Sequence, residues 1–146
     1  MLRGNSPAKI DDRGRLKVPT SFRSYVEEHY GKELYVTSVT GQNVLIYPMP
    51  VWTEIERKLS EMASTDPSRL RYSTRVNFYG QNAELDVQGR VLIHPRLREA
   101  ALMVGEVDVF GQQSHLEVWN HERVLDKLDR EPWTDADARA LSDRGI

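Results

Sequence analysis

The 146-residue sequence contains no cysteine. That absence excludes disulfide bridges, thiol nucleophiles and thiolate metal ligands. No apolar run approaches the ~20 residues that a membrane-spanning helix needs, and the first residues lack the apolar core of a signal peptide. The sequence therefore predicts a soluble cytoplasmic protein that contacts no membrane. Because 39% of the residues are hydrophobic, the chain can bury a core, either as one domain or as two half-domains that share it.

The chain also lacks the residue patterns that usually mark an active site. It contains no glycine-rich phosphate loop, no H-E-x-x-H metal motif and no nucleophile elbow. Its four histidines are not arranged as ligand pairs; they are His29, His94, His115 and His121. We therefore expect no catalytic residue, no metal site, no cofactor and no small-molecule substrate, and we expect a binding protein rather than an enzyme.

Net charge is small, at −2, but it is unevenly distributed. Residues 1–25 hold six basic and two acidic side chains, a net of +4, whereas residues 121–146 hold five basic and seven acidic side chains. Such a basic cluster is either a solvated face or a surface for a polyanion. Its position on a repeated turn favours the second interpretation.

One short pattern occurs twice. The first copy, Asp11–Pro19, reads DDRGRLKVP, and the second, Asp86–Pro95, reads DVQGRVLIHP, 75 residues later. An aspartate that opens a turn can bond the backbone two residues on, and a glycine accommodates a positive φ, so D-x-x-G-R predicts a tight hairpin loop. We assign four residues to the structure of these turns: Asp11, Gly14, Asp86 and Gly89.

The flanking elements repeat as well. Each copy contains, in order, a strand, the turn, a strand, a short helix, two strands and a helix. The later strands are expected at 34–36, 44–47, 107–110 and 116–119, and the helices at 22–26, 51–62, 97–103 and 122–128. Because each half is too small to close a core alone, this duplication predicts a single β-rich barrel with pseudo-two-fold symmetry.

These patterns divide the chain into a first half at 5–50 with a following helix at 51–63, a connecting segment at 64–79, a second half at 80–125 and a C-terminal helix or tail at 126–146. The pair Asp66-Pro67 predicts the start of a helix in the connection, and the tail forms a last helix near 136–141 or frays. One face of the helix at 51–62 is predicted to be a buried core stripe rather than a binding groove; it carries Trp52, Ile55, Leu59 and Met62.

Two Asp-x-x-Gly-Arg patterns with matching flanks resemble the MraZ family of bacterial transcription regulators, which belongs to the AbrB-like, swapped-hairpin class. The resemblance covers nearly the whole chain and includes Leu2-Arg3-Gly4, Leu45-Ile46-Tyr47-Pro48 followed by Trp52, and Ala83-Glu84-Leu85-Asp86 leading to Arg90. It implies an α+β fold, mainly β with short helices, in which each half supplies one hairpin to a double-split barrel.

The resemblance also implies a function. Members of the family assemble into closed rings of identical chains and bind repeated G-rich boxes in double-stranded DNA. The boxes lie upstream of the division and cell-wall gene cluster that these proteins precede and repress. The DNA-reading elements of the family are the two turns, which map here to Asp11 with Arg15 and to Asp86 with Arg90.

The chemistry of the residues agrees with this function. An arginine on a rigid hairpin can bond the O6 and N7 atoms of guanine in the major groove. Phosphate contacts position a protein on DNA without specifying sequence, and we assign them to Arg3, Lys9, Arg13 and Lys17. The second turn has Val87-Gln88 where the first has Asp12-Arg13. We therefore expect unequal turns, in which Arg90 either reads a base or braces the turn or a neighbouring subunit.

Three alternatives stay open at this point. Each arginine could simply form a salt bridge with the aspartate of its own turn, which would explain the pair without DNA. The duplicated hairpins could contact protein partners in an assembly or adaptor protein, whose function would not involve salt-sensitive DNA binding. The chain could also be an AbrB-like antitoxin, although its short tail follows a complete second repeat and offers little to wrap a toxin.

Overall fold

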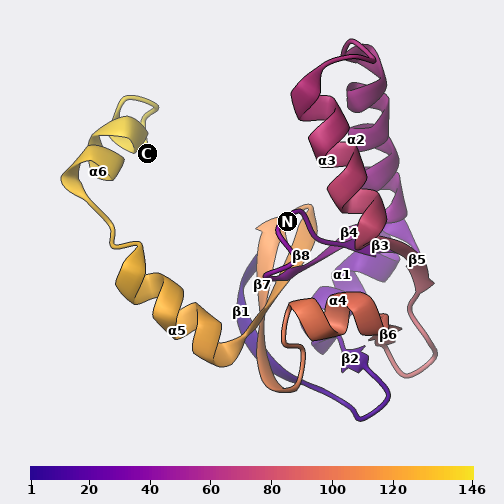
Figure 1. Cartoon of the computed structure of the whole chain (residues 1–146). Coiled ribbons are helices and arrows are strands. Elements are labelled where there is room, and N and C mark those ends of the chain that lie inside the picture. Colours follow the sequence, from indigo (N-terminus) through magenta and orange to yellow (C-terminus); the bar gives the residue numbers. More distant parts are fainter.

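The computed structural model describes all 146 residues as a β-barrel that carries a helical hairpin at one end and a C-terminal arm at its side (Figure 1). The first half contains β1 (Leu2–Ile10), β2 (Arg15–Lys17), α1 (Thr20–Tyr30), β3 (Glu33–Thr37), β4 (Val44–Pro48) and α2 (Met49–Glu61). After α3 (Pro67–Phe78), the second half contains β5 (Gln81–Glu84), β6 (Arg90–Leu92), α4 (Pro95–Ala100), β7 (Gly105–Gln113), β8 (His115–Asn120) and α5 (His121–Arg130), and α6 (Asp135–Ser142) follows. The repeated order of elements that the sequence predicts is confirmed.

The two halves are interleaved in one antiparallel sheet with the order β5-β3-β4-β8-β7-β1-β2-β6. Strand β1 of the first half pairs with β7 of the second over nine residues, and β5 of the second half pairs with β3 of the first over four. The short strands β2 and β6 pair with each other. Since each half completes the sheet of the other, the predicted α+β barrel with exchanged hairpins is confirmed.

A single core fills the barrel. It is a cluster of 20 buried residues drawn from both halves, including Leu16 and Val36 from the first and Val91 and Val109 from the second. This confirms the expectation that neither half closes a core alone. A smaller cluster lies where α2 and α3 meet the sheet, and in it Trp52 stacks on Tyr35 with ring centroids 4.6 Å apart.

The helix predicted at 51–62 is confirmed as α2, but its predicted buried stripe is wrong beyond the first turn. Trp52 is buried against the sheet, Ile55 and Leu59 are half-buried, and Met62 is 39% exposed. The physical reason is that α2 extends beyond the barrel, where α3 is the only element that packs on it (Figure 1). Periodicity identified the residues that share a face, but the length of the helix decides how much of that face is covered.

One other helix departs from its sequence signal, and another begins where its signal predicts. The helix predicted at 97–103 is shorter than expected: α4 ends at Ala100 because Leu102 adopts φ = +53°, and Met103 enters the core outside the helix. In the connection, the side chain of Asp66 accepts the N–H groups of Ser68 and Arg69 and so caps α3. None of the helices has the length and apolar composition that crossing a bilayer requires.

Candidate nucleic-acid interface

The first turn is closed by its own aspartate. One carboxylate oxygen of Asp11 accepts the backbone N–H of Arg13 at 2.9 Å and that of Arg15 at 2.8 Å. Gly14 adopts φ = +80°, which strains any residue with a side chain, and donates its N–H to the Asp11 carbonyl at 3.0 Å. The N–H of Arg15 is the main cause that holds the pKa of Asp11 below its ordinary value, so the carboxylate is ionised at neutral pH.

The second turn has the same geometry. Asp86 accepts the N–H groups of Gln88 at 2.8 Å and Arg90 at 2.9 Å, while Gly89 has φ = +76° and donates to the Asp86 carbonyl at 3.0 Å. The N–H of Arg90 is the main cause that lowers the pKa of Asp86. The two hairpins are therefore copies of one rigid scaffold, which the aspartate and the glycine build.

The two turns lie side by side because β2 and β6 pair with each other. Leu16 lies opposite Val91 in this ladder. Beyond the ladder, the N–H of Val18 donates to the carbonyl of Gly89 at 3.0 Å, and the N–H of Ile93 donates to the carbonyl of Gly14 at 2.9 Å. These reciprocal bonds place the turns on either side of a pseudo-two-fold axis. The sequence repeat thus folds into one composite surface rather than two separate ones.

Both turn arginines are held by an aspartate through the inner nitrogen of the guanidinium. Nε of Arg15 donates to Oδ2 of Asp11 at 2.8 Å, and Nε of Arg90 donates to Oδ2 of Asp86 at 3.2 Å. Each arginine side chain is about 30% exposed (31% and 27%). No group of the chain accepts a hydrogen bond from the two Nη atoms of Arg15. The salt bridge orients Arg15 and leaves its outer edge open for a two-point contact with an acceptor pair.

The pseudo-symmetry is broken at the centre of this surface. Nη1 of Arg90 lies 3.8 Å from Oδ2 of Asp11, so Asp11 is shared by both arginines. Asp86 pairs with Arg90 alone. The Nη atoms of Arg90, like those of Arg15, donate no hydrogen bond, but Arg90 lies within ion-pair distance of two carboxylates and Arg15 of one.

Two further arginines reach across to the opposite turn. Arg23 of α1 donates from Nη2 to the carbonyl of Val87 at 3.1 Å, and its side chain covers Gly89, where a Cβ would collide with it. Arg98 of α4 covers Gly14 in the same way. The sequence interpretation missed both residues. The available signal was their equal spacing, since each lies eight residues after the arginine of its own turn.

The positive charge around the turns comes mainly from the first copy. Lys9, Arg13 and Lys17 are exposed beside the first turn. The residues 75 positions later are not basic; they are Glu84, Gln88 and Leu92. Arg3 is exposed but is not gathered with this group, since it lies six residues before Lys9 along β1, about 20 Å away at ~3.3 Å per residue.

No group of three or more histidine, aspartate and glutamate side chains lies close enough together to hold a metal ion. All four histidines have structural contacts instead, and His29 stacks on Tyr25 with its Nδ1 2.9 Å from the carbonyl of that residue. Nε2 of His94 lies 2.7 Å from the carbonyl of Tyr79, His115 stacks on Tyr47, and Nδ1 of His121 lies 2.6 Å from Asp108. The bond to Asp108 is the main cause that raises the pKa of His121.

The chain is similar to known proteins over its full length. A family model described as "MraZ protein, putative antitoxin-like" matches residues 1–72 and 80–144. The chain is 42% identical to a protein of Acidobacterium capsulatum and 44% identical to one of Koribacter versatilis, each covering 100% of both chains. It is 34% identical to an Escherichia coli protein, over 99% of this chain and 96% of the other. All three are named transcriptional regulator MraZ, and the chain described here belongs to the MraZ family.

Proposed function

We propose that this chain is a transcriptional regulator that binds double-stranded DNA with the composite surface of its two turns. The observation that carries the proposal is the state of Arg15, whose Nε is fixed by Asp11 while its two Nη atoms are open at the exposed edge of a rigid hairpin. The names of the full-length relatives support a regulatory role.

In this proposal the paired hairpins enter the major groove, which is wide enough for a two-stranded ribbon. Arg15 bonds O6 and N7 of a guanine, a contact worth about 1–3 kcal/mol of discrimination against the wrong base. Lys9, Arg13 and Lys17 contact phosphates on the first-turn side and fix the register. Arg90 braces the surface through Asp86 and Asp11, and Arg23 and Arg98 keep the turns in place before DNA arrives, which reduces the entropy lost on binding.

The operator, on the same proposal, is a set of repeated G-rich boxes upstream of the division and cell-wall gene cluster to which this chain's own gene belongs, and binding represses that cluster. A single chain is poorly suited to this task, because its net charge is −2 and only one side of its turn surface is basic. A ring of several chains presents several such surfaces to the repeated boxes, and linked sites raise the effective concentration of each. The ring is expected to associate with the nucleoid.

A binding titration with the DNA immediately upstream of the protein's own gene tests this proposal. Gel-shift and fluorescence anisotropy measurements, with a scrambled duplex of equal composition as control, should show tighter binding to the upstream DNA and an affinity that falls as salt rises. Equal, weak binding to both duplexes at all salt concentrations would overturn the proposal and favour the adaptor interpretation. Light scattering on the same sample should report a mass well above the 16.8 kDa of one chain.

A further inference from the structure

The C-terminal arm, residues 131–146, contains a helix that is closed at both ends by its own residues. At its start, Thr134 and Asp137 form a capping box, with N–H to side-chain bonds of 3.2 and 3.0 Å. At its end, the N–H of Ile146 donates to the carbonyl of Leu141 and that of Gly145 to Ser142, both at 3.0 Å, in the Schellman pattern. The local sequence therefore specifies α6 as a helix.

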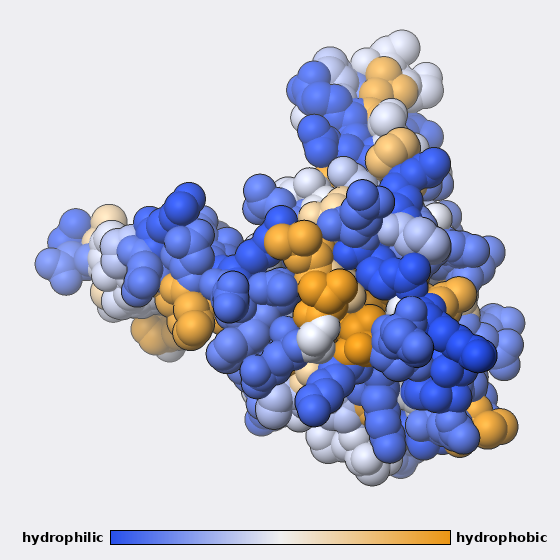
Figure 2. All heavy atoms as spheres, turned by 60° about the horizontal axis from the view of Figure 1, so that its bottom comes forward, coloured by the Kyte–Doolittle hydropathy of each residue, from blue (hydrophilic) through white to orange (hydrophobic).

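This helix has no support from its own barrel. Every residue from 131 to 146 is exposed, including Trp133 at 68% and Ile146 at 80%. Figure 1 shows α6 standing away from the sheet, and Figure 2 shows the arm projecting from the body with apolar atoms on its surface. A helix of eight residues is marginal in water without packing. The arm thus needs an apolar surface that its own chain does not place against it.

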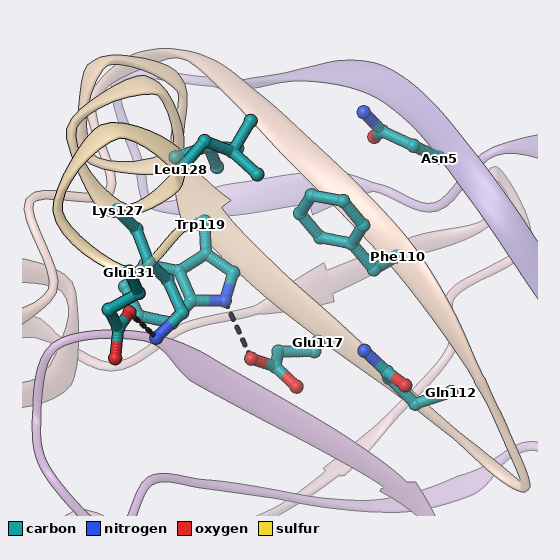
Figure 3. Close-up of a pocket in the computed structure, with 9 residues that line it drawn as sticks. Asn5, Phe110, Gln112, Glu117, Trp119, Lys127, Leu128 and Glu131 are labelled. Carbon is teal, nitrogen blue, oxygen red and sulfur yellow. Dashed lines mark hydrogen bonds and ion pairs between the residues drawn. The ribbon is translucent and has the colours of Figure 1, made fainter. Parts of the chain in front are cut away.

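The root of the arm is fixed to the barrel. Helix α5 lies over a groove on β7 and β8, where Figure 3 shows Leu128 beside Trp119 and Phe110. The polar groups there are paired with one another: Trp119 donates to Glu117 at 2.6 Å, and Lys127 bonds Glu131 at 2.6 Å. The arm therefore starts from a helix that rests on its own barrel.

A surface with the complementary character lies on α3 of the same chain. Leu70 and Phe78 are each 52% exposed, and together with Arg71 and Arg75 they line a shallow groove on the outer face of this helix. Helix α3 carries three arginines and no acidic residue, a net of +3. The side chains of the arm, residues 131–146, include four acidic groups and two arginines, a net of −2. The two surfaces therefore attract each other.

Each surface carries two large apolar side chains. Leu70 and Phe78 are eight residues apart, about 12 Å along α3 at ~1.5 Å per residue. In the arm, Leu141 lies in the last turn of α6 and Trp133 directly precedes its N-cap, Thr134. Within one chain the two surfaces cannot meet, because α3 and α6 lie at separate extremities of the molecule (Figure 1).

We propose that the C-terminal arm of one copy docks on the outer face of α3 of a second copy. The inference rests on the oligomeric part of the proposed function and names the contact that would build the oligomer. Each chain then donates one arm and accepts one arm, so the contact is head-to-tail and forms a ring where the rotation closes. The turn surface lies at the opposite end of the barrel from α3 and stays open to DNA (Figure 1).

Two double variants test the contact, and each replaces only exposed or partly exposed apolar residues. The arm variant carries Trp133→Ser and Leu141→Ser, and the helix variant carries Leu70→Ser and Phe78→Ser. Val104→Ser, at a residue that is 64% exposed elsewhere on the barrel, is the matched control. Light scattering at micromolar protein should report 16.8 kDa for each double variant and the wild-type mass for the control. Circular dichroism verifies that all variants fold.

Mixing the two double variants gives the decisive result. Each retains one intact surface, so an equimolar mixture should form a complex of two chains although each variant alone is a monomer. Either double variant with the wild-type mass, or a mixture that stays monomeric, would overturn this inference while the proposed DNA binding and the oligomer stand. A monomeric wild type that binds its operator tightly would overturn both the inference and the proposed ring.

Discussion

The first and second turns have the same backbone and different surroundings. Both use an aspartate to accept two N–H groups, a glycine at positive φ and an arginine bonded to that aspartate. They differ in the exposed residues around this frame. The first copy has Lys9, Arg13 and Lys17, and the equivalent positions of the second copy hold Glu84, Gln88 and Leu92. The aspartate and the glycine of each copy close the turn, so the fold itself accounts for their repetition. The residues that differ determine which of the two turns has the more basic surface.

The comparison also separates the two arginines. Arg15 has one carboxylate partner and Arg90 has two, because Asp11 lies between them. The two hairpins have equivalent backbones. Only the first has an arginine with a single carboxylate partner, Arg15, together with exposed basic residues beside it, which are Lys9, Arg13 and Lys17. We interpret the first turn as the reading element and the second as its brace.

The largest effect is expected when the first turn is converted to the surface of the second. A variant with Lys9→Glu, Asp12→Val, Arg13→Gln and Lys17→Leu changes the charge of this face by −3 and keeps the turn frame. Its affinity for any duplex should fall roughly 100-fold at moderate salt, and the slope of log K against log salt should decrease in magnitude by about three. An unchanged affinity for operator DNA would show that the basic rim of the first turn makes no contact with phosphates.

Substitution of the two turn glycines should lower the stability of the protein by similar amounts, whereas the basic residues beside the two turns differ. Gly14→Ala and Gly89→Ala each place a side chain at positive φ, at a cost of about 1–2 kcal/mol, and each Cβ also displaces the arginine that covers it, Arg98 or Arg23. Gly4→Ala, at φ = +87° with no atom within 4 Å, isolates the backbone cost. Urea denaturation should show that both turn variants are less stable than Gly4→Ala. A turn variant as stable as that control would contradict the close contact between the glycine and the arginine side chain that covers it.

A single phosphate contact gives a smaller effect. Lys9→Ala should weaken binding to operator and scrambled DNA alike and reduce the salt slope by about one. Glu84→Ala, at the equivalent position of the second copy, is the matched control and should leave the slope unchanged or slightly steeper. An equal decrease of slope in the two variants would mean that the effect of Lys9→Ala is not the loss of a phosphate contact.

The smallest expected effect is on the response to acid. Backbone N–H groups lower the pKa of both Asp11 and Asp86. The stabilisation from these carboxylates is therefore present above their unfolded pKa of about 4 and is lost as the pH falls through the lower folded value. NMR titration of the two carboxyl groups should give midpoints below the ordinary aspartate value. Asp11→Asn should disturb both arginines, and Asp86→Asn only Arg90.

Elements with local signals were predictable from the sequence. The D-x-x-G pattern fixed the two turns, the pairs of apolar runs fixed the strands, and the Asp66-Pro67 pair marked the start of α3. The duplication predicted a shared core because each half is small, and the folded chain has one cluster of 20 buried residues drawn from both halves. The contacts of the turn surface that could not be predicted are those between the two halves.

The features of the turn surface that the sequence missed are of that long-range kind. Arg23 donates a hydrogen bond to the carbonyl of Val87, which lies 64 positions later in the sequence. Arg90 lies near Asp11 because β2 pairs with β6. No local pattern encodes these distances. The same cause explains why Arg3 was grouped with Lys9. The two residues lie on one nine-residue strand, β1, and the length of this strand is set by its pairing with β7.

The account depends most directly on the difference between Arg15→Ala and Arg90→Ala in binding to operator and scrambled DNA. At several salt concentrations, Arg15→Ala should bind both duplexes with the same weak affinity, because the guanine contact worth about 1–3 kcal/mol per site is gone, while its circular dichroism matches that of the wild type. Arg90→Ala should keep most of the preference for operator DNA. If Arg15→Ala binds the operator as tightly and as selectively as the wild type, the Asp11–Arg15 pair is a structural salt bridge and the first turn does not read DNA.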